Sequence, residues 1–564
     1  MDRRPERIRI IHELGKPQSL PAGEDQFDRY GPAILPDRAS FCADMLLLGL
    51  GPDPAVAAAA VCSVAGPCGP APDAAAPRKT VHYVECPEFE RQMPAHWAAA
   101  IPGHWQRISP QQCTPELLAR STTLFYRQNT RLFPSFWGPL LAAAQWEHLR
   151  HNTACAAVDA PTPSPASSAS PACPTSREKS AKSAESADRT VILPGTEQGL
   201  LIRELREAFT DEGWHVLTVP PQDMATTLPR LLAQHSPRLF FSVNFQGLDM
   251  FGERHHLLRA AGTEVAAWCV DTPWHILSGC KAPFWKDTHL FVTDDTFLPD
   301  LRATGGTDVH HLPLATDPRI FSPSDATAER QHDAPQDHEL AQAAVFVGRS
   351  EFPERRKYFS GLVPDSALMA KATQMLSTGE RPDYHWWTRQ LGITGFWPDT
   401  PRHAGAGAEE ASRRWRALCL EQALPHGLTV FGDQGWHTAV PGLRRLHPPV
   451  DYYTRLPAIY RKAGITLNIT GLLLPGGLTQ RHFDVWAAGG LLLTDANPGM
   501  HIFPAHLAQA VTYHRADELP ERMAAWRATP DSTKELRSMW RNVILNGHTY
   551  RHRVRQVLAA VFAS

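Results

Sequence analysis

The sequence of 564 residues has no excess of charge of either sign. It contains 56 Lys and Arg against 58 Asp and Glu, which leaves a formal charge of −2. A protein that coats DNA or RNA needs a marked basic excess, so we expect no nucleic-acid partner. The 16 Trp and 23 Phe exclude a chain that is disordered throughout. The length predicts two to four domains.

Long apolar runs and paired cysteines are also missing. The most apolar stretch, residues 45–65, is interrupted by Pro52, Asp53 and Pro54, whereas a membrane-spanning helix needs about 20 predominantly apolar residues. The first residues lack the apolar core of a signal peptide. None of the ten Cys forms a C-x-x-C pair, which argues against a zinc site or a redox dithiol. We therefore expect a cytoplasmic protein with no transmembrane segment and no bound metal.

Proline, by contrast, is abundant, and part of it lies in residues 153–189 together with Ala, Ser, Thr and Lys. This composition cannot form a core and predicts a disordered linker. Before the linker, apolar runs at 45–51, 81–85 and 123–126 predict an accessory Rossmann-like α/β domain over residues 1–152. A methyltransferase is a distant alternative for this domain, because a lone Gly-x-Gly is weak evidence.

After the linker, apolar runs alternate with helical or loop stretches. This alternation is typical of parallel sheets covered on both faces. It predicts two doubly wound domains, over residues 190–325 and 326–564, with terminal helices at about 517–528 and 532–562. Such sheets bind ligands at the carboxyl ends of their strands, so we expect a cleft between the two domains. The predicted strands are 191–193, 216–219, 239–243, 265–270, 290–293 and 311–315 in the first domain, and 344–348, 428–431, 465–469 and 490–494 in the second.

Residues 451–495 hold the most informative pattern. A strand ends at Asn468, and a loop with Gly476 and Gly477 leads into a helix that starts near Thr479–Gln480. Free N–H groups at a helix start can hold a phosphate. In the alternative interpretation, Thr479 is an ordinary N-cap.

Two further side chains of this helix suit a nucleotide. Arg481 offers a bidentate donor to a diphosphate, and Asp484 lies about one turn later, where a carboxylate can bind ribose hydroxyls. The alternative is that Arg481 is solvated and that Gly489–Gly490 simply ends the helix.

Four segments carry a resemblance to a known family. Residues 451–495, which include G-L-L-L-P-G-G-L-T-Q-R-H-F-D, and residues 546–553, N-G-H-T-Y-R-H-R, resemble the CgeB-like (spore-maturation) glycosyltransferase family. The segments W-C-V-D-T-P (268–273) and L-P-L-A-T-D-P (312–318) resemble the N-terminal half that often accompanies it. The resemblance implies a GT-B fold, in which the second of two Rossmann-like domains mainly holds a nucleotide-sugar donor. It also implies sugar transfer without a bound metal, with the nucleotide-diphosphate sugar as co-substrate and no other cofactor.

Two positions depart from the family pattern. Asp484 falls where such enzymes usually have a Glu that contacts the donor ribose, and the shorter side chain has less reach. Many retaining GT-B enzymes carry another Glu eight positions earlier, where this chain has Gly476. The resemblance therefore does not imply a retaining mechanism.

Residues after two other strands of the second domain are further donor-binding candidates. Gly348 and Arg349 resemble a phosphate-side turn, at which Arg349 would neutralise the leaving diphosphate. Gly432 and Asp433 follow the next strand and precede Trp436, which would either stack on a base or sugar or pack in the core.

Asp271 is the candidate catalytic base, because it follows the strand that ends at Val270 and should face the cleft. An inverting transfer needs a base within hydrogen-bond reach of the acceptor hydroxyl. The alternative is a capping Asp before Thr272 and Pro273, and Asp294 and Asp295 are reserve candidates.

His548 and His552 stand four residues apart and could ligate a metal. With no third ligand in the pattern, packing or hydrogen bonding is the favoured role.

These observations favour a glycosyltransferase that moves a sugar to an unidentified acceptor hydroxyl on a surface polysaccharide, a lipid-linked glycan or a protein. A non-catalytic nucleotide-sugar or glycan-binding scaffold of the same fold is the alternative, and a GT-B sugar epimerase is a third.

Overall fold

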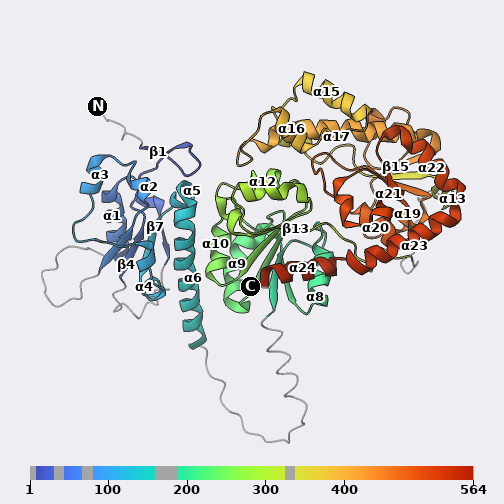
Figure 1. Cartoon of the computed structure of the whole chain (residues 1–564). Helices are drawn as coiled ribbons and strands as arrows, with labels where there is room; N and C mark the ends of the chain where they lie inside the picture. Colours follow the sequence, from blue (N-terminus) through green and yellow to red (C-terminus); the bar gives the residue numbers. More distant parts are fainter. Residues whose placement is uncertain (1–7, 31–43, 66–79, 159–188, 324–336, 563–564) are drawn as a thin grey trace, which may run out of the picture.

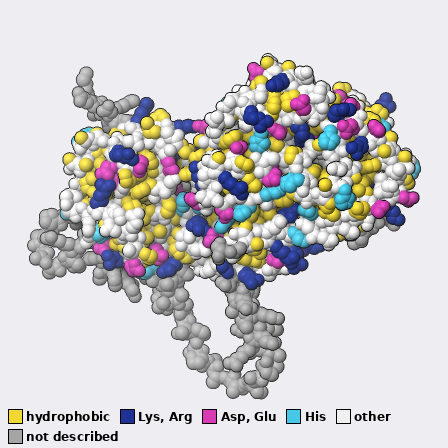
Figure 2. All heavy atoms as spheres, in the orientation of Figure 1, with side chains coloured by type: hydrophobic (Ala, Val, Ile, Leu, Met, Phe, Trp, Pro, Cys, Tyr) yellow, Lys and Arg dark blue, Asp and Glu magenta, His cyan; other side chains and the backbone are white. Residues whose placement is uncertain are grey.

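The computed structural model describes residues 8–30, 44–65, 80–158, 189–323 and 337–562. They form three α/β units that follow one another along the chain (Figure 1). Within these ranges, no helix is both long and apolar enough to cross a membrane. Figure 2 shows cationic and anionic side chains interspersed over the visible face, so this face presents no continuous field of one sign.

The first unit covers the described residues up to 158. Its sheet has the order β3-β7-β4-β5-β6, with β3 antiparallel to β7 and the other pairs parallel. The strands are β3 (Phe27–Tyr30), β4 (Met45–Leu48), β5 (Val81–Val84), β6 (Gln106–Arg107) and β7 (Thr122–Tyr126), with β1 (Arg9–Ile11) and β2 (Pro17–Ser19) as a separate antiparallel pair. The helices are α1 (Pro54–Ala65), α2 (Pro87–Glu90), α3 (Ala95–Ala99), α4 (Pro115–Arg120), α5 (Asn129–Leu132) and α6 (Pro134–Val158).

Helix α6 joins the first unit to the second. It packs against α10 (Glu253–Ala260), and Figure 1 shows the two helices side by side. The approach is close, because a Cβ at Gly138 would lie 2.3 Å from the ring of His256. The helix also continues to Val158, beyond the predicted start of the linker at residue 153. Most of the predicted linker, residues 159–188, lies outside the described residues.

The second unit covers residues 189–323 and has a six-stranded parallel sheet in the order β13-β12-β11-β10-β8-β9. The strands are β8 (Thr190–Pro194), β9 (His215–Val219), β10 (Leu239–Val243), β11 (Glu264–Cys269), β12 (His289–Val292) and β13 (Val309–His311). The helices, besides α10, are α8 (Ile202–Asp211), α9 (Met224–His235), α11 (Pro273–Leu277) and α12 (Leu298–Ala303). The last strand begins at Val309, two residues before the predicted run.

The third unit covers residues 337–547 and has a second six-stranded parallel sheet, in the order β16-β15-β14-β17-β18-β19. This is the doubly wound order 3-2-1-4-5-6, in which the chain reverses direction between β14 and β17. The strands are β14 (Ala344–Val347), β15 (Leu428–Phe431), β16 (Arg445–His447), β17 (Ile465–Asn468), β18 (Leu492–Asp495) and β19 (Thr512–Tyr513). The helices are α13 (Asp337–Gln342), α14 (Arg355–Tyr358), α15 (Ser366–Ser377), α16 (Tyr384–Gln390), α17 (Pro401–Ala423), α18 (Gly435–Ala439), α19 (Leu456–Lys462), α20 (Arg481–Ala487), α21 (Ala505–Val511), α22 (Leu519–Ala528) and α23 (Pro530–Gly547). Two doubly wound units after an extra α/β unit confirm the predicted fold class.

Helices α14 to α17 form an excursion between β14 and β15. Asp365 and Asp383 cap α15 and α16 by accepting backbone N–H bonds at the helix starts. The apolar faces of these helices share a core with the second unit, in which Trp387 and Ala408 pack in the same buried cluster as Trp274. The excursion therefore binds the second and third units together.

The last helix, α24 (Tyr550–Phe562), differs from the prediction in two ways. A single helix over 532–562 was expected, but the chain breaks at His548 and Thr549, where Thr316 pairs with Thr549. Beyond the break, Val554 and Val557 pack in the core of the second unit with α8, so the predicted assignment of residues 326–564 to one domain is wrong for this helix. The reason is its apolar face, which the strands of the second unit cover.

Candidate functional site

Two cavities meet between the second and third units. The larger has a volume of about 720 Å³ and the smaller about 340 Å³. Asp271, Thr272 and Leu473 line both. The Thr272 hydroxyl donates to the Leu473 carbonyl at 3.1 Å, so this contact closes the cleft at the boundary between the cavities.

Asp271 stands at this boundary because it follows β11, whose carboxyl end faces the cleft. The Asn244 amide donates to its Oδ2 at 2.8 Å, and Asn244 Oδ1 accepts the Val270 N–H at 2.9 Å. Burial between the units raises the pKa of Asp271, and the Asn244 bond acts against this rise. The carboxylate is thus oriented by a neighbour and open to two cavities, as a general base requires. Its catalytic role stays a prediction.

Asn244 was not among the predicted residues. It lies just after β10, and both it and Phe245 have positive φ, at 52° and 59°. Asn tolerates this conformation, whereas it is strained for Phe. The contact with Asp271 joins positions 27 residues apart, which no local pattern reveals.

The larger cavity is lined by two arginines from the third unit, Arg349 and Arg416. Arg416 donates to the Arg349 carbonyl at 3.1 Å and lies 3.5 Å from the carboxylate of Glu409. Burial lowers the pKa of Arg416 and raises that of Glu409. Arg349 is exposed and lines the cavity, as its predicted role requires. Arg416 and Glu409, both on α17, were missed because that helix was not predicted.

The smaller cavity is bounded by the loop before α20. Gly477, Thr479 and Gln480 line it, together with Asp271. The Thr479 N–H donates to Nδ1 of His482 at 3.0 Å, so this donor at the helix start is already used by the protein. The three predicted residues thus face a cavity, and their binding of a donor stays a prediction.

Gly476 in the same loop is pressed against the second unit. Its N–H donates to Asp294 Oδ2 at 2.9 Å, and a Cβ at this position would lie 2.8 Å from Oδ1 of the same carboxylate. Asp294 also accepts the Thr296 hydroxyl at 2.6 Å. A glutamate at position 476 does not fit this contact, and Asp294 holds the loop instead of facing the cleft as a base.

Arg481 and Asn468 lie where the third sheet changes direction, between β14 and β17. Arg481 donates from Nε to Asn468 Oδ1 at 2.7 Å and from Nη1 to the Val347 carbonyl at 2.6 Å. Its guanidinium also lies 5.6 Å from the centre of the Phe346 ring. Burial lowers the pKa of Arg481. The predicted diphosphate ligand is therefore engaged by the protein, and Asn468 is fully buried beside it.

Trp436 packs in the core, at 1% exposure, which is the second of the two alternatives that the sequence left open. Its Nε1–H donates to the Gly348 carbonyl at 2.8 Å, and a Cβ at Gly432 would lie 2.3 Å from that carbonyl. Asp433 accepts the Ser350 N–H at 2.8 Å. Burial alone would raise the pKa of Asp433, but hydrogen bonds from Ser350 and Gly435 outweigh burial and lower this pKa. These residues shape the loop that presents Arg349.

Asp484 is buried at 1% exposure and lines neither cavity, and its contact with a ribose stays a prediction. The Tyr452 hydroxyl donates to its Oδ2 at 2.8 Å. Burial raises the pKa of Asp484 well above its usual value, and the nearby Glu204 adds to the rise. Asp484 lies four residues after Gln480, on the same face of the helix, but its carboxylate accepts from Tyr452 and lies near Glu204 of α8.

His548 and His552 have separate partners. Nδ1 of His548 accepts from Arg553 at 2.9 Å, and Nδ1 of His552 pairs with the Thr549 hydroxyl at 2.7 Å. The hydrogen-bonding role that the sequence favoured for them fits these contacts.

Comparisons with known proteins bear on the third unit and α24. Residues 413–559 match a family described as glycosyl transferase-like. No curated protein matches the sequence. This stretch is similar to glycosyltransferase domains, in agreement with the predicted enzyme class; the CgeB-like subfamily stays a prediction.

Several solved structures are similar over much of the chain. HepE from Anabaena in complex with UDP-glucose has a TM-score of 0.39 at 8% identity and covers 66% of this chain and 100% of its own. A mutant O-GlcNAc transferase of Thermobaculum terrenum has a TM-score of 0.33 at 12% identity, covering 75% of this chain and 76% of its own. UGT89C1 from Arabidopsis thaliana has a TM-score of 0.33 at 10% identity, covering 66% of this chain and 99% of its own.

Proposed function

We propose that this protein transfers a sugar from a nucleotide-diphosphate sugar to an acceptor hydroxyl, with Asp271 as the base. The observation that carries the proposal is the place of Asp271, at the junction of two cavities between two doubly wound units. The glycosyl transferase-like match over residues 413–559 supports the reaction class. The acceptor is a glycan, a lipid-linked glycan or a protein.

In this mechanism the donor and the acceptor meet at Asp271, where the two cavities join. The third unit contributes Arg349 and Arg416, whose positive charges stabilise the charge that grows on a departing nucleoside diphosphate. The second unit presents the acceptor hydroxyl, from which Asp271 takes a proton as the oxygen attacks the anomeric carbon. The proposed transfer uses no metal, because the two arginine side chains take the place of a cation at the diphosphate.

A non-catalytic nucleotide-sugar or glycan-binding scaffold is the second candidate. Gly476 favours it, because many retaining enzymes of this fold carry a glutamate there and the contact with Asp294 leaves no room for one. The two candidates differ in turnover rather than in binding.

Calorimetry with UDP, GDP and CDP and their sugar conjugates, followed by a turnover assay with the same panel, separates the candidates. The transferase predicts binding together with hydrolysis or transfer that the change Asp271→Asn abolishes. Binding of a conjugate with no turnover, with and without candidate acceptors, would establish the scaffold instead. Conversion of the sugar with no acceptor present would indicate an epimerase.

A further inference from the structure

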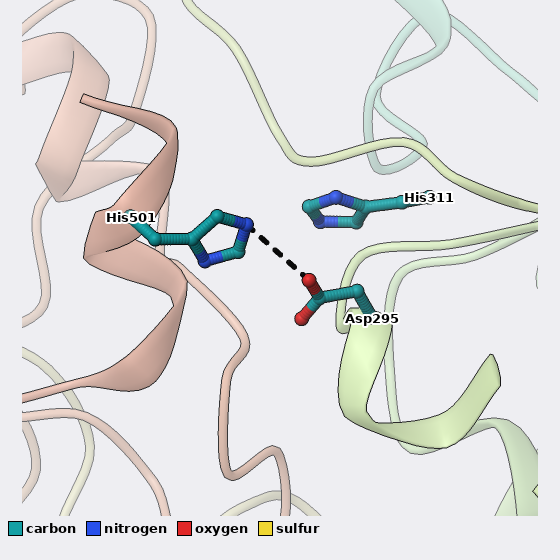
Figure 3. A group of neighbouring side chains, drawn as sticks. All are labelled: Asp295, His311 and His501. Carbon is teal, nitrogen blue, oxygen red and sulfur yellow. Dashed lines mark ion pairs between the residues drawn. The ribbon is translucent and has the colours of Figure 1, made fainter. Parts of the chain in front are cut away.

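Three side chains from distant parts of the chain converge at the border between the second and third units. Asp295 follows β12 and His311 ends β13, both in the second unit, whereas His501 belongs to a short 3₁₀ turn (Pro498–Ile502) of the third. One ligand atom from each lies within 4.8 Å of the others. Figure 3 shows the two imidazole rings and the carboxylate directed into one shared space.

The hydrogen bond of His501 leaves its other ring nitrogen for this space. Nδ1 of His501 lies 2.9 Å from the Pro498 carbonyl, which can only accept, so Nδ1 carries the proton. The ring of His311 also bonds to the backbone of Thr293. Backbone carbonyls commonly fix the ring orientation of metal-binding histidines by such bonds.

The contact between His501 and Asp295 requires a positive charge. With its proton on Nδ1, a neutral His501 directs the lone pair of Nε2 toward Oδ2 of Asp295, which lies 3.3 Å away. Two lone pairs at this distance repel each other unless a proton or a cation lies between them. The ion pair drawn in Figure 3 is therefore one of two states that satisfy the geometry.

We propose that Asp295, His311 and His501 bind a divalent metal ion of the zinc class, which links the second unit to the third. Two imidazoles and one carboxylate are a ligand set typical of such ions, with a fourth position open to water. Ligands of a tetrahedral zinc ion lie about 3.4 Å apart, so the pair of Asp295 and His501 is already spaced for it. His501 is half exposed, which leaves a path for the ion and room for a water ligand.

The ion would act on the loop that borders the smaller cavity. A Cβ at Gly476 would lie 3.4 Å from Asp295 Oδ1, and one at Gly499, within the 3₁₀ turn of His501, would overlap the Gly476 carbonyl. The Gly476 loop is thus wedged between the two sides of the proposed metal site. None of the three ligands lines either cavity, so the proposal is independent of the proposed sugar transfer.

Calorimetric titration of the full-length, tag-free, chelator-treated protein with Zn²⁺ tests the site. We expect one tight site per chain, and binding weakened on the order of 100-fold or more in His501→Ala and in Asp295→Asn. His506→Ala, which removes an exposed histidine five positions further on, is the matched control and should bind as the parent protein does. Mg²⁺ at the same concentrations should not compete, because histidine ligands disfavour it.

A second readout tests the link between the units. Zn²⁺ should raise the protection of residues 471–479 against hydrogen exchange in the parent protein and in His506→Ala, but not in Asp295→Asn or His501→Ala. Equal zinc affinity in all four proteins, or no binding at millimolar Zn²⁺, would overturn the proposal and leave a protonated ion pair at this place.

Discussion

Two charged residues near the carboxyl ends of the two six-stranded sheets, Arg481 and Asp271, have opposite surroundings. In the third unit, Arg481 at the start of α20 donates to Asn468 and to the Val347 carbonyl, so the protein itself engages it. In the second unit, Asp271 follows its strand and stays open to both cavities, and the Asn244 amide donates to it. A polar residue at a strand end therefore marks the correct edge of a sheet but does not by itself mark a ligand contact.

The largest effect should come from the open side of this comparison. Asp271→Asn should lower turnover by about 10²- to 10⁴-fold while nucleotide affinity is retained, because only proton removal is lost. Steady-state kinetics and calorimetry on the same preparation measure both quantities. Burial raises the pKa of Asp271, so the carboxylate takes up its proton at a higher pH than an ordinary Asp does. As the pH is lowered, the activity of the parent protein should therefore begin to fall at a correspondingly higher pH. Asp223→Asn, an exposed change in the same unit, is the control, and full turnover by Asp271→Asn would assign the base elsewhere.

The engaged state of Arg481 in the third unit is tested by replacing this residue. Arg481→Met should lower the free energy of unfolding by about 3 kcal/mol, since it removes two bonds made by a charged group and leaves the Val347 carbonyl unpaired. Urea denaturation, with the exposed Arg444→Met as control, measures the change. Unaltered stability combined with a tenfold loss of nucleotide affinity would show that Arg481 serves the ligand and would abolish the contrast between the two residues.

A smaller effect is expected at the contact between the units. Gly476→Ala places a Cβ 2.8 Å from Asp294 Oδ1 and should cost about 1–3 kcal/mol, with faster hydrogen exchange in residues 471–479. Gly471→Ala in the same loop meets no atom within 4 Å and is the matched control. Equal exchange in both variants would mean that the loop does not depend on its contact with Asp294.

The smallest effect concerns Asp484 and depends on pH. An acid whose pKa is raised in the folded state releases its proton on unfolding, so its presence lowers stability as pH rises above its unfolded pKa of about 4. Asn does not ionise. The difference in free energy of unfolding between Asp484→Asn and the parent protein should therefore shift in favour of the variant between pH 4 and pH 8, while nucleotide affinity is unchanged. Denaturation series at the two pH values measure this difference, and a loss of nucleotide affinity would support the predicted ribose contact.

Most of the sheet strands could be predicted from apolar runs, because a strand buried on both faces is apolar at every position. The run 239–243 coincides with β10, and 344–348 differs from β14 by one residue. Helix α17 was not predicted because its first half is rich in Ala and Gly and shows no stripe of large apolar residues. These small residues instead allow a close helix contact, as at Gly407, which lies against Trp387.

By itself, the sequence determined the number of units, the positions of most strands along the chain and the place of Asp271 at a strand end, all of which follow from local periodicity. Tertiary structure alone decided which polar residues remain open. Asp484 and Trp436 are enclosed because other units or strands pack over them, and Arg416, Asn244 and the group of Asp295, His311 and His501 assemble from segments far apart in the chain. Burial and convergence depend on contacts between distant residues, and these contacts have no signature in the order of neighbours along the chain.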